Sequence, residues 1–428
     1  MGFNKVFSLL LVFVVLGATA GIVGAVPAEK ARVIITIDKD FNEKSVFALG
    51  GNVVARGKVF PIVIAELPPR AIERLKNAKG VVRVEYDAKV FAYPKPPSPP
   101  GRDKDKEPSQ PAQEIPWGIE RINATGAWSV SDGFSGGVIE VAIIDTGIDR
   151  DHPDLKDNIA WGVSVLNGRI STKPNSYQDR NGHGTHVAGT IAAINNEIGV
   201  VGVAPAVEIY AIKALGNDGS GWISDIILGI EQALLGPDGV LDSDNDGVIV
   251  GDPDDDAAEV ISMSLGGSSD VQAFHDAIIE AYNYGVVIVA ASGNDEASSP
   301  SYPAAYPEVI AVGATDSDDQ VPWWSNRGVE VSAPGVDILS TYPNDSYETL
   351  QGTSMATPHV SGVVALIQAA HYNKYGSVLP VGTFDDMGTN TVRGILHSTA
   401  DDHGSPGWDA DYGYGIVRAD LAVQAAVN

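Results

Sequence analysis

The segment Val138-Ile-Glu-Val-Ala-Ile-Ile-Asp145-Thr-Gly147 indicates how most of this chain folds. Its apolar residues follow one another almost without alternation, which is typical of a strand covered on both faces. The run then changes abruptly to a carboxylate, a hydroxyl and a glycine. Buried strands of this kind belong to parallel sheets that carry helices on both sides, and polar functional residues gather where such strands end.

The same pattern recurs along the chain. Strands are expected at 138–144, 207–212, 260–263, 286–290 and 309–312, and helices at 183–194, 224–235, 271–284, 354–372 and 391–398. Because buried strands alternate with helical segments, we predict an α/β fold for residues 113–428, with a mainly parallel central sheet and helices on both faces.

A smaller unit is predicted before this domain, in residues 26–93. Its strands are expected at 32–37, around 53, at 61–65 and at 81–86, and its helices at 42–49 and 69–78. This order describes a small α+β unit of the βαββαβ type, which at about 60 residues is marginally stable alone and needs a partner surface. The following segment, 94–112, carries seven prolines between residues 94 and 111 and is predicted to be an exposed, protease-accessible linker.

Charge divides the chain in the same place. The net charge is -27, yet residues 1–108 hold 17 Lys/Arg against 11 Asp/Glu, whereas the rest holds 11 against 44. An acidic body of this kind repels phosphates and argues against nucleic acid as a partner, while it favours cation binding. The basic front unit has the charge to bind the acidic body.

Residues 1–25 have the pattern of a secretory signal. Lys5 precedes an apolar run at 6–15, and small residues end near Ala20 or Ala25. An uncleaved membrane anchor is the alternative, since the run is about long enough to span a bilayer. We expect a secreted, extracellular protein without membrane contact after signal removal. The chain has no cysteine, which excludes disulfides and a cysteine nucleophile.

Four polar fragments fall where the predicted sheet ends or a helix begins. They are Asp145 in Val141-Ala-Ile-Ile-Asp145-Thr-Gly147, His183 in Asn181-Gly-His183-Gly-Thr-His186, Ser354 in Gly352-Thr-Ser354-Met-Ala, and Asn294 in Ser292-Gly-Asn294. Taken singly, each has an ordinary explanation as a turn residue or helix cap. Together they supply a nucleophile, a base, a carboxylate that orients the base, and a donor for an oxyanion.

A metal pair is another interpretation of the histidine fragment, because His183 and His186 are one helical turn apart. A zinc site of that type requires a third ligand and usually an acidic residue inside the motif. The fragment offers neither, so we expect His186 to be packed in the core.

The three signatures, in the order Asp, His, Ser, resemble the subtilisin family of serine proteases, and specifically the calcium-rich pro-subtilisins of hyperthermophilic archaea. The resemblance covers nearly the whole chain from Ala31 onward. It implies that Asp145 stabilises the imidazolium, that His183 is base and then acid, and that Ser354 attacks the scissile carbonyl. Asn294 and the Ser354 N–H would form the oxyanion hole.

The resemblance also implies how substrate binds and how the enzyme is made. Ser264, Leu265 and Gly266 would pair with the main chain of a peptide substrate, so we expect broad specificity with a permissive or apolar pocket for the residue before the scissile bond. Residues 26–93 would assist folding and inhibit the enzyme until autoprocessing near 90–93. Here the sequence departs from the family, since Pro94 follows directly and proline after the scissile bond resists proteolysis.

An acidic insertion at 236–256 contains eight aspartates and no basic residue. Asp242, Asp244, Asp246 and Gly247 match positions 1, 3, 5 and 6 of a calcium loop, with the Val248 carbonyl at position 7 and Pro253 where an EF-hand has glutamate. The remaining candidate ligands are Asp238, Asp252, Asp254, Asp255 and Asp256. A solvated loop is the alternative, but close carboxylates repel one another unless cations neutralise them, so we expect several Ca²⁺ ions.

A second calcium site is implied by the resemblance alone. Its ligands would be Gln113, Asp154, Ile194, Asn196, Ile198 and Val200. The predicted function is thus a calcium-dependent serine endopeptidase, monomeric, thermostable and made as a zymogen with protein or peptide substrates. A catalytically silent calcium-binding protein on the same fold is the competing interpretation.

Overall fold

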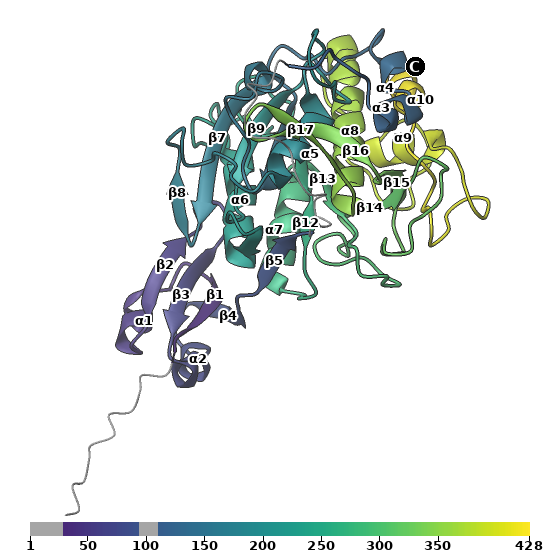
Figure 1. Cartoon of the computed structure of the whole chain (residues 1–428). Helices are drawn as coiled ribbons and strands as arrows, with labels where there is room; N and C mark the ends of the chain where they lie inside the picture. The colour runs from purple at the N-terminus through teal and green to yellow at the C-terminus, as the bar shows by residue number, and fades with distance from the viewer. Residues whose placement is uncertain (1–28, 94–109) are drawn as a thin grey trace, which may run out of the picture.

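The computed structural model describes residues 29–93 and 110–428. The signal peptide predicted at 1–25 and most of the linker predicted at 94–112 therefore lie outside the described residues. Two sheets organise the chain, an eight-stranded sheet in the larger unit and a four-stranded sheet in the front unit (Figure 1). Within the described ranges, no helix combines the length and the apolar character that crossing a bilayer requires.

The larger sheet has the strand order β15-β14-β13-β11-β6-β9-β7-β8. Its strands are β6 (Glu140–Asp145), β7 (Ile159–Leu166), β8 (Arg169–Ser171), β9 (Glu208–Lys213), β11 (Val260–Met263), β13 (Val287–Ala291), β14 (Val309–Thr315) and β15 (Val331–Pro334). Neighbouring strands are parallel except for the β7 and β8 pair, which is antiparallel. The large sheet with its helices agrees with the α/β fold predicted from the buried apolar runs.

Helices cover both faces of this sheet. On one face lie α5 (His183–Ala192), α8 (Thr353–Tyr375), α9 (Val392–Thr399) and α10 (Ala419–Ala426), and on the other lie α6 (Ile223–Leu235) and α7 (Gln272–Asn283). Alternate residues of β6 divide between them: Val141 and Ile143 join the core around α8, whereas Ala142 and Ile144 join the core around α6. The two-sided burial explains why the strand sequences lack alternation.

The predicted elements match the observed ones to within one to three residues at each end. The helix expected to run to Ile194 ends at Ala192, while the helix that begins near Ser354 continues to Tyr375. Several elements were missed: β7, β8 and β15, the hairpin of β16 (Ile338–Tyr342) and β17 (Ser346–Leu350), and the helices α3 (Trp117–Arg121), α4 (Ala124–Ala127) and α10. Most of them lack a long apolar run, so little in their own sequence separates them from loops.

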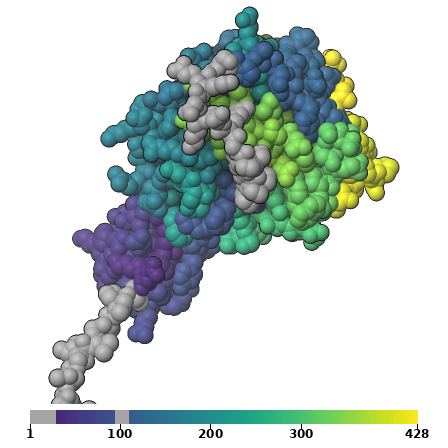
Figure 2. All heavy atoms as spheres, viewed as in Figure 1, coloured from purple at the N-terminus to yellow at the C-terminus, as the bar shows by residue number. Residues whose placement is uncertain are grey.

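The front unit contains β1 (Ala31–Ile37), α1 (Lys44–Ala48), β2 (Asn52–Arg56), β3 (Ile62–Leu67), α2 (Pro69–Leu75) and β4 (Val81–Tyr86). The strand order is β2-β3-β1-β4 with antiparallel pairs, as the predicted βαββαβ order requires. One face packs Val33 and Ile35 against the unit's own helices, and the other packs Ile34 and Ile62 into the core that contains α6 and α7. Figure 2 shows the front unit seated against the larger one.

A last strand leaves the front unit and enters the larger one. This strand, β5 (Lys89–Ala92), lies between β10 (Ser220–Trp222) and β12 (Leu265–Gly266) in a separate three-stranded sheet. Both of its pairings are antiparallel. The front unit therefore reaches the carboxyl edge of the large sheet through its own backbone.

Candidate active site

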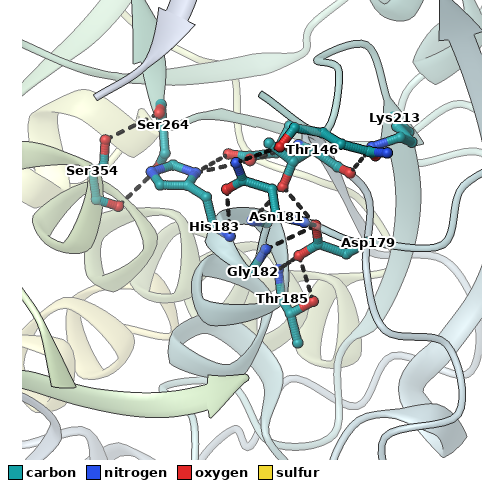
Figure 3. A network of polar contacts seen from close by, with 12 residues as sticks. Thr146, Asp179, Asn181, Gly182, His183, Thr185, Lys213, Ser264 and Ser354 are labelled. Carbon is teal, nitrogen blue, oxygen red and sulfur yellow. Dashed lines mark hydrogen bonds and ion pairs between the residues drawn. The ribbon is translucent and has the colours of Figure 1, made fainter. Parts of the chain in front are cut away.

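The four polar residues predicted to act together meet at the carboxyl edge of the large sheet. Asp145 is the last residue of β6, and Asn294 follows β13. His183 is the first residue of α5 and Ser354 the second residue of α8. Figure 3 shows His183 with Ser354 and Ser264 on one side of its ring and with Thr146 and Asp179 on the other.

The Asp145 carboxylate holds the His183 ring. Its oxygens lie 2.8 and 3.0 Å from His183 Nδ1, and both side chains are buried. Burial disfavours the charged ring, but the Asp145 charge and hydrogen bond outweigh it and raise the pKa of His183. His183 Nε2 is buried and has no hydrogen-bond partner among the described residues. The pairing with Nδ1 leaves Nε2 as the free basic nitrogen.

Ser354 is tied to Ser264 through a reciprocal pair of hydrogen bonds. The Ser354 hydroxyl donates to the Ser264 carbonyl over 3.0 Å, and the Ser264 hydroxyl donates to the Ser354 carbonyl over 2.8 Å. The first N–H groups of α8 lack partners in a preceding turn, so this helix end favours negative charge. The free His183 Nε2 is the acceptor available to the Ser354 hydroxyl once it leaves Ser264.

The Asn294 side chain is oriented from behind by Thr353. The backbone N–H and the hydroxyl of Thr353 donate to Asn294 Oδ1 over 3.0 and 2.9 Å, which leaves the amide NH₂ as the free end. A Cβ added to Gly352 would lie 3.1 Å from Asn294 Nδ2 and 3.7 Å from the Ser354 nitrogen. Gly352 has a φ of +147°, so glycine is required there, and it keeps open a space that both donors reach.

The cleft beside these residues is filled by the chain's own β5. Phe91 pairs with Gly266 on one side and with Ser220 on the other, and Ala92 pairs with Leu265. Two of the three residues predicted to bind substrate backbone thus bind residues 91–92. The second pairing strand, β10, was missed in the sequence because only three residues form it.

The residue after β5 enters a cavity of about 710 Å³. Tyr93 is one of its lining residues, together with Gly266, Ser301 and Asn326. Burial raises the pKa of Tyr93 to about 12, and the nearby Ser301 hydroxyl opposes part of this rise. A large aromatic side chain therefore fits in this pocket. A second cavity of about 440 Å³ lies alongside, lined by His183, Tyr342, Leu350 and Met355.

The six residues of the second predicted calcium site are brought together. Asp154 is fully buried and accepts hydrogen bonds from Asn196 Nδ2 and the Val200 N–H over 2.8 and 3.0 Å. Gln113 Nε2 donates to the Ile194 and Val200 carbonyls, and the Ile198 N–H donates to Asn196 Oδ1. Burial raises the pKa of Asp154. Turning the two side-chain amides would present their oxygens together with the carboxylate and carbonyls, a donor set that suits Ca²⁺.

The acidic insertion forms two clusters of three carboxylates each, and the two clusters share one residue. Ligand atoms of Asp242, Asp244 and Asp246 lie within 4.8 Å of one another, as do those of Asp244, Asp252 and Asp255. Asp242 Oδ1 and Asp255 Oδ2 are buried without a hydrogen-bond partner among the described residues. Three other candidate ligands belong to neither cluster: Asp238, Asp254 and Asp256. The orphaned oxygens and the all-oxygen donor set fit Ca²⁺.

Three residues next to the catalytic candidates were missed by the sequence analysis: Thr146, Asp179 and Lys213. All three are buried. Thr146 follows Asp145 and Asp179 precedes His183 by four positions, but spacing alone does not separate them from turn residues. Their role depends on contacts that only the fold creates. His186, expected in the core, is buried with Nε2 2.9 Å from the Ile338 carbonyl.

Comparison with known proteins identifies the relatives of this chain. Residues 136–415 match the subtilase family. An alkaline protease of Shouchella clausii is 38% identical over 369 residues, which cover 86% of this chain and 80% of the relative. Subtilisin E of Bacillus subtilis (strain 168) is 39% identical over 381 residues, covering 88% and 84%. Subtilisin Savinase of Lederbergia lenta is 42% identical over 315 residues, covering 73% and 100%.

Proposed function

Since the chain belongs to the subtilase family and is a serine endopeptidase of the subtilisin type, we propose that Asp145, His183 and Ser354 are its catalytic residues. One observation carries this assignment. Asp145 holds His183 Nδ1 at 2.8 Å, while the buried Nε2 on the other side of the ring has no hydrogen-bond partner within residues 29–93 and 110–428. A base held in this tautomer, next to a serine at a helix N-terminus, is suited to acyl transfer.

The proposed reaction follows from these positions. Ser354 Oγ attacks the carbonyl carbon of the scissile peptide as its proton passes to His183 Nε2, and Asp145 stabilises the resulting imidazolium. Asn294 and the Ser354 N–H donate to the oxyanion in the space beside Gly352. His183 then protonates the leaving amine, and water hydrolyses the acyl-enzyme by the same route.

We propose broad specificity with an apolar preference for the side chain before the scissile bond. Recognition of backbone by β10 and β12 is largely independent of side chains. The pocket that holds Tyr93 accepts a large aromatic group, and Tyr302 and Ala297 contribute apolar surface to it. The substrates are proteins and peptides in an extended conformation.

We propose that the front unit is an inhibitory propeptide and the chain a zymogen. Its β5 occupies the substrate position, and three consecutive N–H groups, of Lys58, Val59 and Phe60, donate to the fully buried Glu231. Glu85 accepts from the Gln272 N–H at the start of α7, as Asp87 does from the Ser224 N–H in α6. These carboxylates sit at the positive ends of the two helices, which adds favourable electrostatics to the apolar contact.

We further propose several bound Ca²⁺ ions, at the two carboxylate clusters of the insertion and at the Asp154 site. Binding to the folded state alone adds stability by mass action, which suits a chain without disulfides. The proposed protein is secreted, monomeric and thermostable. It is also proposed to stand close to the calcium-rich pro-subtilisins of hyperthermophilic archaea, and the acidic insertion and the signature motifs support this last point.

The test is peptide hydrolysis and autoprocessing by the purified full-length chain, with and without Ca²⁺, beside Ser354→Ala. Ser361→Ala is the matched control, because this serine lies on the same helix and its hydroxyl bonds to Ser262 and to the Thr357 carbonyl. Wild type and the control should mature to a smaller active form in Ca²⁺, and Ser354→Ala should not. Activity that survives in Ser354→Ala would overturn the mechanism, and activity without Ca²⁺ would overturn the calcium dependence.

A further inference from the structure

We propose that Asp179, acting through Thr146 and balanced by Lys213, is a positioning residue for the Asp145 and His183 pair; this rests on the proposed function. Asp179 lies in the loop before α5 and is 2% exposed. Among the described residues, its carboxylate makes no hydrogen bond to the Ser354 hydroxyl or to the His183 ring. Its charge acts on the His183 ring through space, and its hydrogen bonds act through Thr146 and the backbone of α5 (Figure 3).

Asp179 closes the N-terminus of α5, the helix that begins with His183. Oδ1 accepts from the N–H groups of Asn181 and Gly182 over 2.9 and 3.0 Å. Oδ2 accepts from the N–H and the hydroxyl of Thr185 over 3.0 and 2.7 Å. Because these donors lie on both sides of His183 in the chain, the carboxylate sets the position from which the ring projects.

Thr146 connects this carboxylate to Asp145. Its hydroxyl donates to Asp179 Oδ1 over 3.0 Å and accepts from the Gly184 N–H over 2.9 Å. Its own N–H donates to Asp145 Oδ1 over 2.6 Å. One buried residue thus links the strand that carries Asp145 to the helix that carries His183. A shift of either element would strain this link.

Lys213 ends β9 and supplies the compensating charge. Its ammonium group donates to the Thr146 carbonyl and is 4% exposed. Burial lowers the pKa of Lys213, and the Asp179 and Asp145 charges oppose that effect. Because the Lys213 charge interacts with those of Asp179 and Asp145, it offsets part of the negative charge beside the imidazolium that forms on His183.

The charges around the ring predict the direction of each electrostatic effect. Asp145 and Asp179 favour protonated His183, and His186 on the same helix stays neutral because burial lowers its pKa to about 3. Lys213 also faces Arg180 and Asp218. Removing the Asp179 charge should therefore lower the pKa of His183, whereas removing the Lys213 charge should raise it.

The experiment measures the pH profile of kcat/KM for Asp179→Asn, Lys213→Met and the double variant, with mature enzyme in saturating Ca²⁺. The acid limb reports the catalytic base in free enzyme. It should move to lower pH by roughly half a unit or more in Asp179→Asn, to higher pH in Lys213→Met, and back toward wild type in the double variant. Unmoved limbs, or shifts in one direction for both single variants, would overturn the proposal.

A second series keeps the proposal testable if the charge variants fold poorly. Thr146→Val removes the linking hydroxyl and should lower kcat by roughly tenfold or more, while Thr146→Ser restores it. Thr190→Val is the matched control, since that buried hydroxyl bonds only to the His186 carbonyl of its own helix. Equal kcat in Thr146→Val and Thr190→Val would refute the link. The Ser354→Ala experiment tests the proposed function itself. The Asp179, Lys213 and Thr146 variants test only the positioning role, so the failure of one proposal can be told from the failure of the other.

Discussion

Two groups of carboxylates in this molecule are treated in opposite ways. Near the catalytic site, Asp145 and Asp179 are buried, and protein donors hold both of them. In the acidic insertion, Asp244 and Asp246 are exposed, and one buried oxygen each of Asp242 and Asp255 has no hydrogen-bond partner in the part of the chain that the structure describes. Carboxylates that the protein itself satisfies can position a reacting group, whereas carboxylates left without donors can accept a cation.

The local electrostatics follow the same division. The Asp246 N–H stabilises the Asp244 carboxylate, but desolvation together with the nearby charges of Asp246, Asp252 and Asp242 outweighs it and raises the pKa of Asp244. Around His183, the carboxylates instead face a ring that becomes positive during the proposed reaction. The following predictions test this contrast, beginning with the largest expected effect.

Asp145→Asn should reduce kcat by about 10⁴-fold, the value known for the orienting carboxylate of serine protease triads. An amide favours the wrong tautomer of His183 while the shape of the site is kept. Peptide hydrolysis by the mature variant gives kcat, and the melting temperature in Ca²⁺ checks the fold. A variant that retains wild-type turnover would remove Asp145 from the mechanism. It would also weaken the distinction between the carboxylates near the catalytic site and those of the acidic insertion.

Asn294→Ala should leave the fold intact and slow turnover by roughly a hundredfold or more, a value known for subtilisin and carried over from it. The side chain is held by Thr353 at its oxygen end, so its loss mainly removes the donor to the oxyanion. The readout is kcat against KM, with kcat carrying the effect. A rise in KM at constant kcat would assign Asn294 to ground-state binding instead.

Asp244→Asn should weaken the stabilisation of the fold by Ca²⁺, because Asp244 belongs to both carboxylate clusters of the insertion. At a Ca²⁺ concentration 100 times Kd, one site adds about 2.7 kcal/mol, so in a chain of this length chelation should lower the wild-type melting temperature by roughly 3 to 5 °C for each site emptied. Calorimetry over a calcium series should show a smaller gain in Asp244→Asn. Asp254→Asn is the control, because Asp254 lies outside both clusters. An equal loss of calcium-dependent stability in this control would show that the insertion acts only as a general acidic surface.

Acid should destabilise the catalytic core through two buried histidines. Burial lowers the pKa of His186 to about 3 and that of His359 to about 4, below their ordinary value near 6.5. The unfolded chain binds these protons more readily, so the stability that the neutral rings contribute is present above pH 6.5 and is lost as the pH falls toward 4.

The expected loss is roughly 1 kcal/mol per pH unit for each ring. Denaturant unfolding between pH 6.5 and 4.5, in saturating Ca²⁺, measures it, and His359→Gln should flatten the slope. A slope unchanged in this variant would show that His359 does not contribute to acid unfolding.

Local sequence was sufficient for five of the eight strands of the large sheet, and it indicated the catalytic candidates. Fully apolar runs such as that of β6 identify buried strands, and the glycine-flanked fragments around His183 and Ser354 identify the edge at which they end. The βαββαβ unit was also predictable, since each of its elements has its own periodicity. In these regions, local pattern and global fold agree.

Contacts between distant segments were not predictable. β5, β10 and β12 contain two to four residues each and exist as strands only because they pair with one another. Nothing in residues 89–93 indicates that Tyr93 enters a pocket beside Gly266. Likewise, Asp179 and Lys213 become neighbours of Asp145 only when the parallel strands align.

The position of β5 has a kinetic consequence. In the proposed zymogen, β5 would compete with substrate at the effective concentration of a tethered ligand, which is in the millimolar range for short flexible connections. Cutting the chain once would not remove β5, but it would exchange that fixed local concentration for the concentration in bulk solution. From then on dilution would set the pace of activation: a secreted molecule far from its neighbours would become active soonest, and a crowded population would remain latent longest.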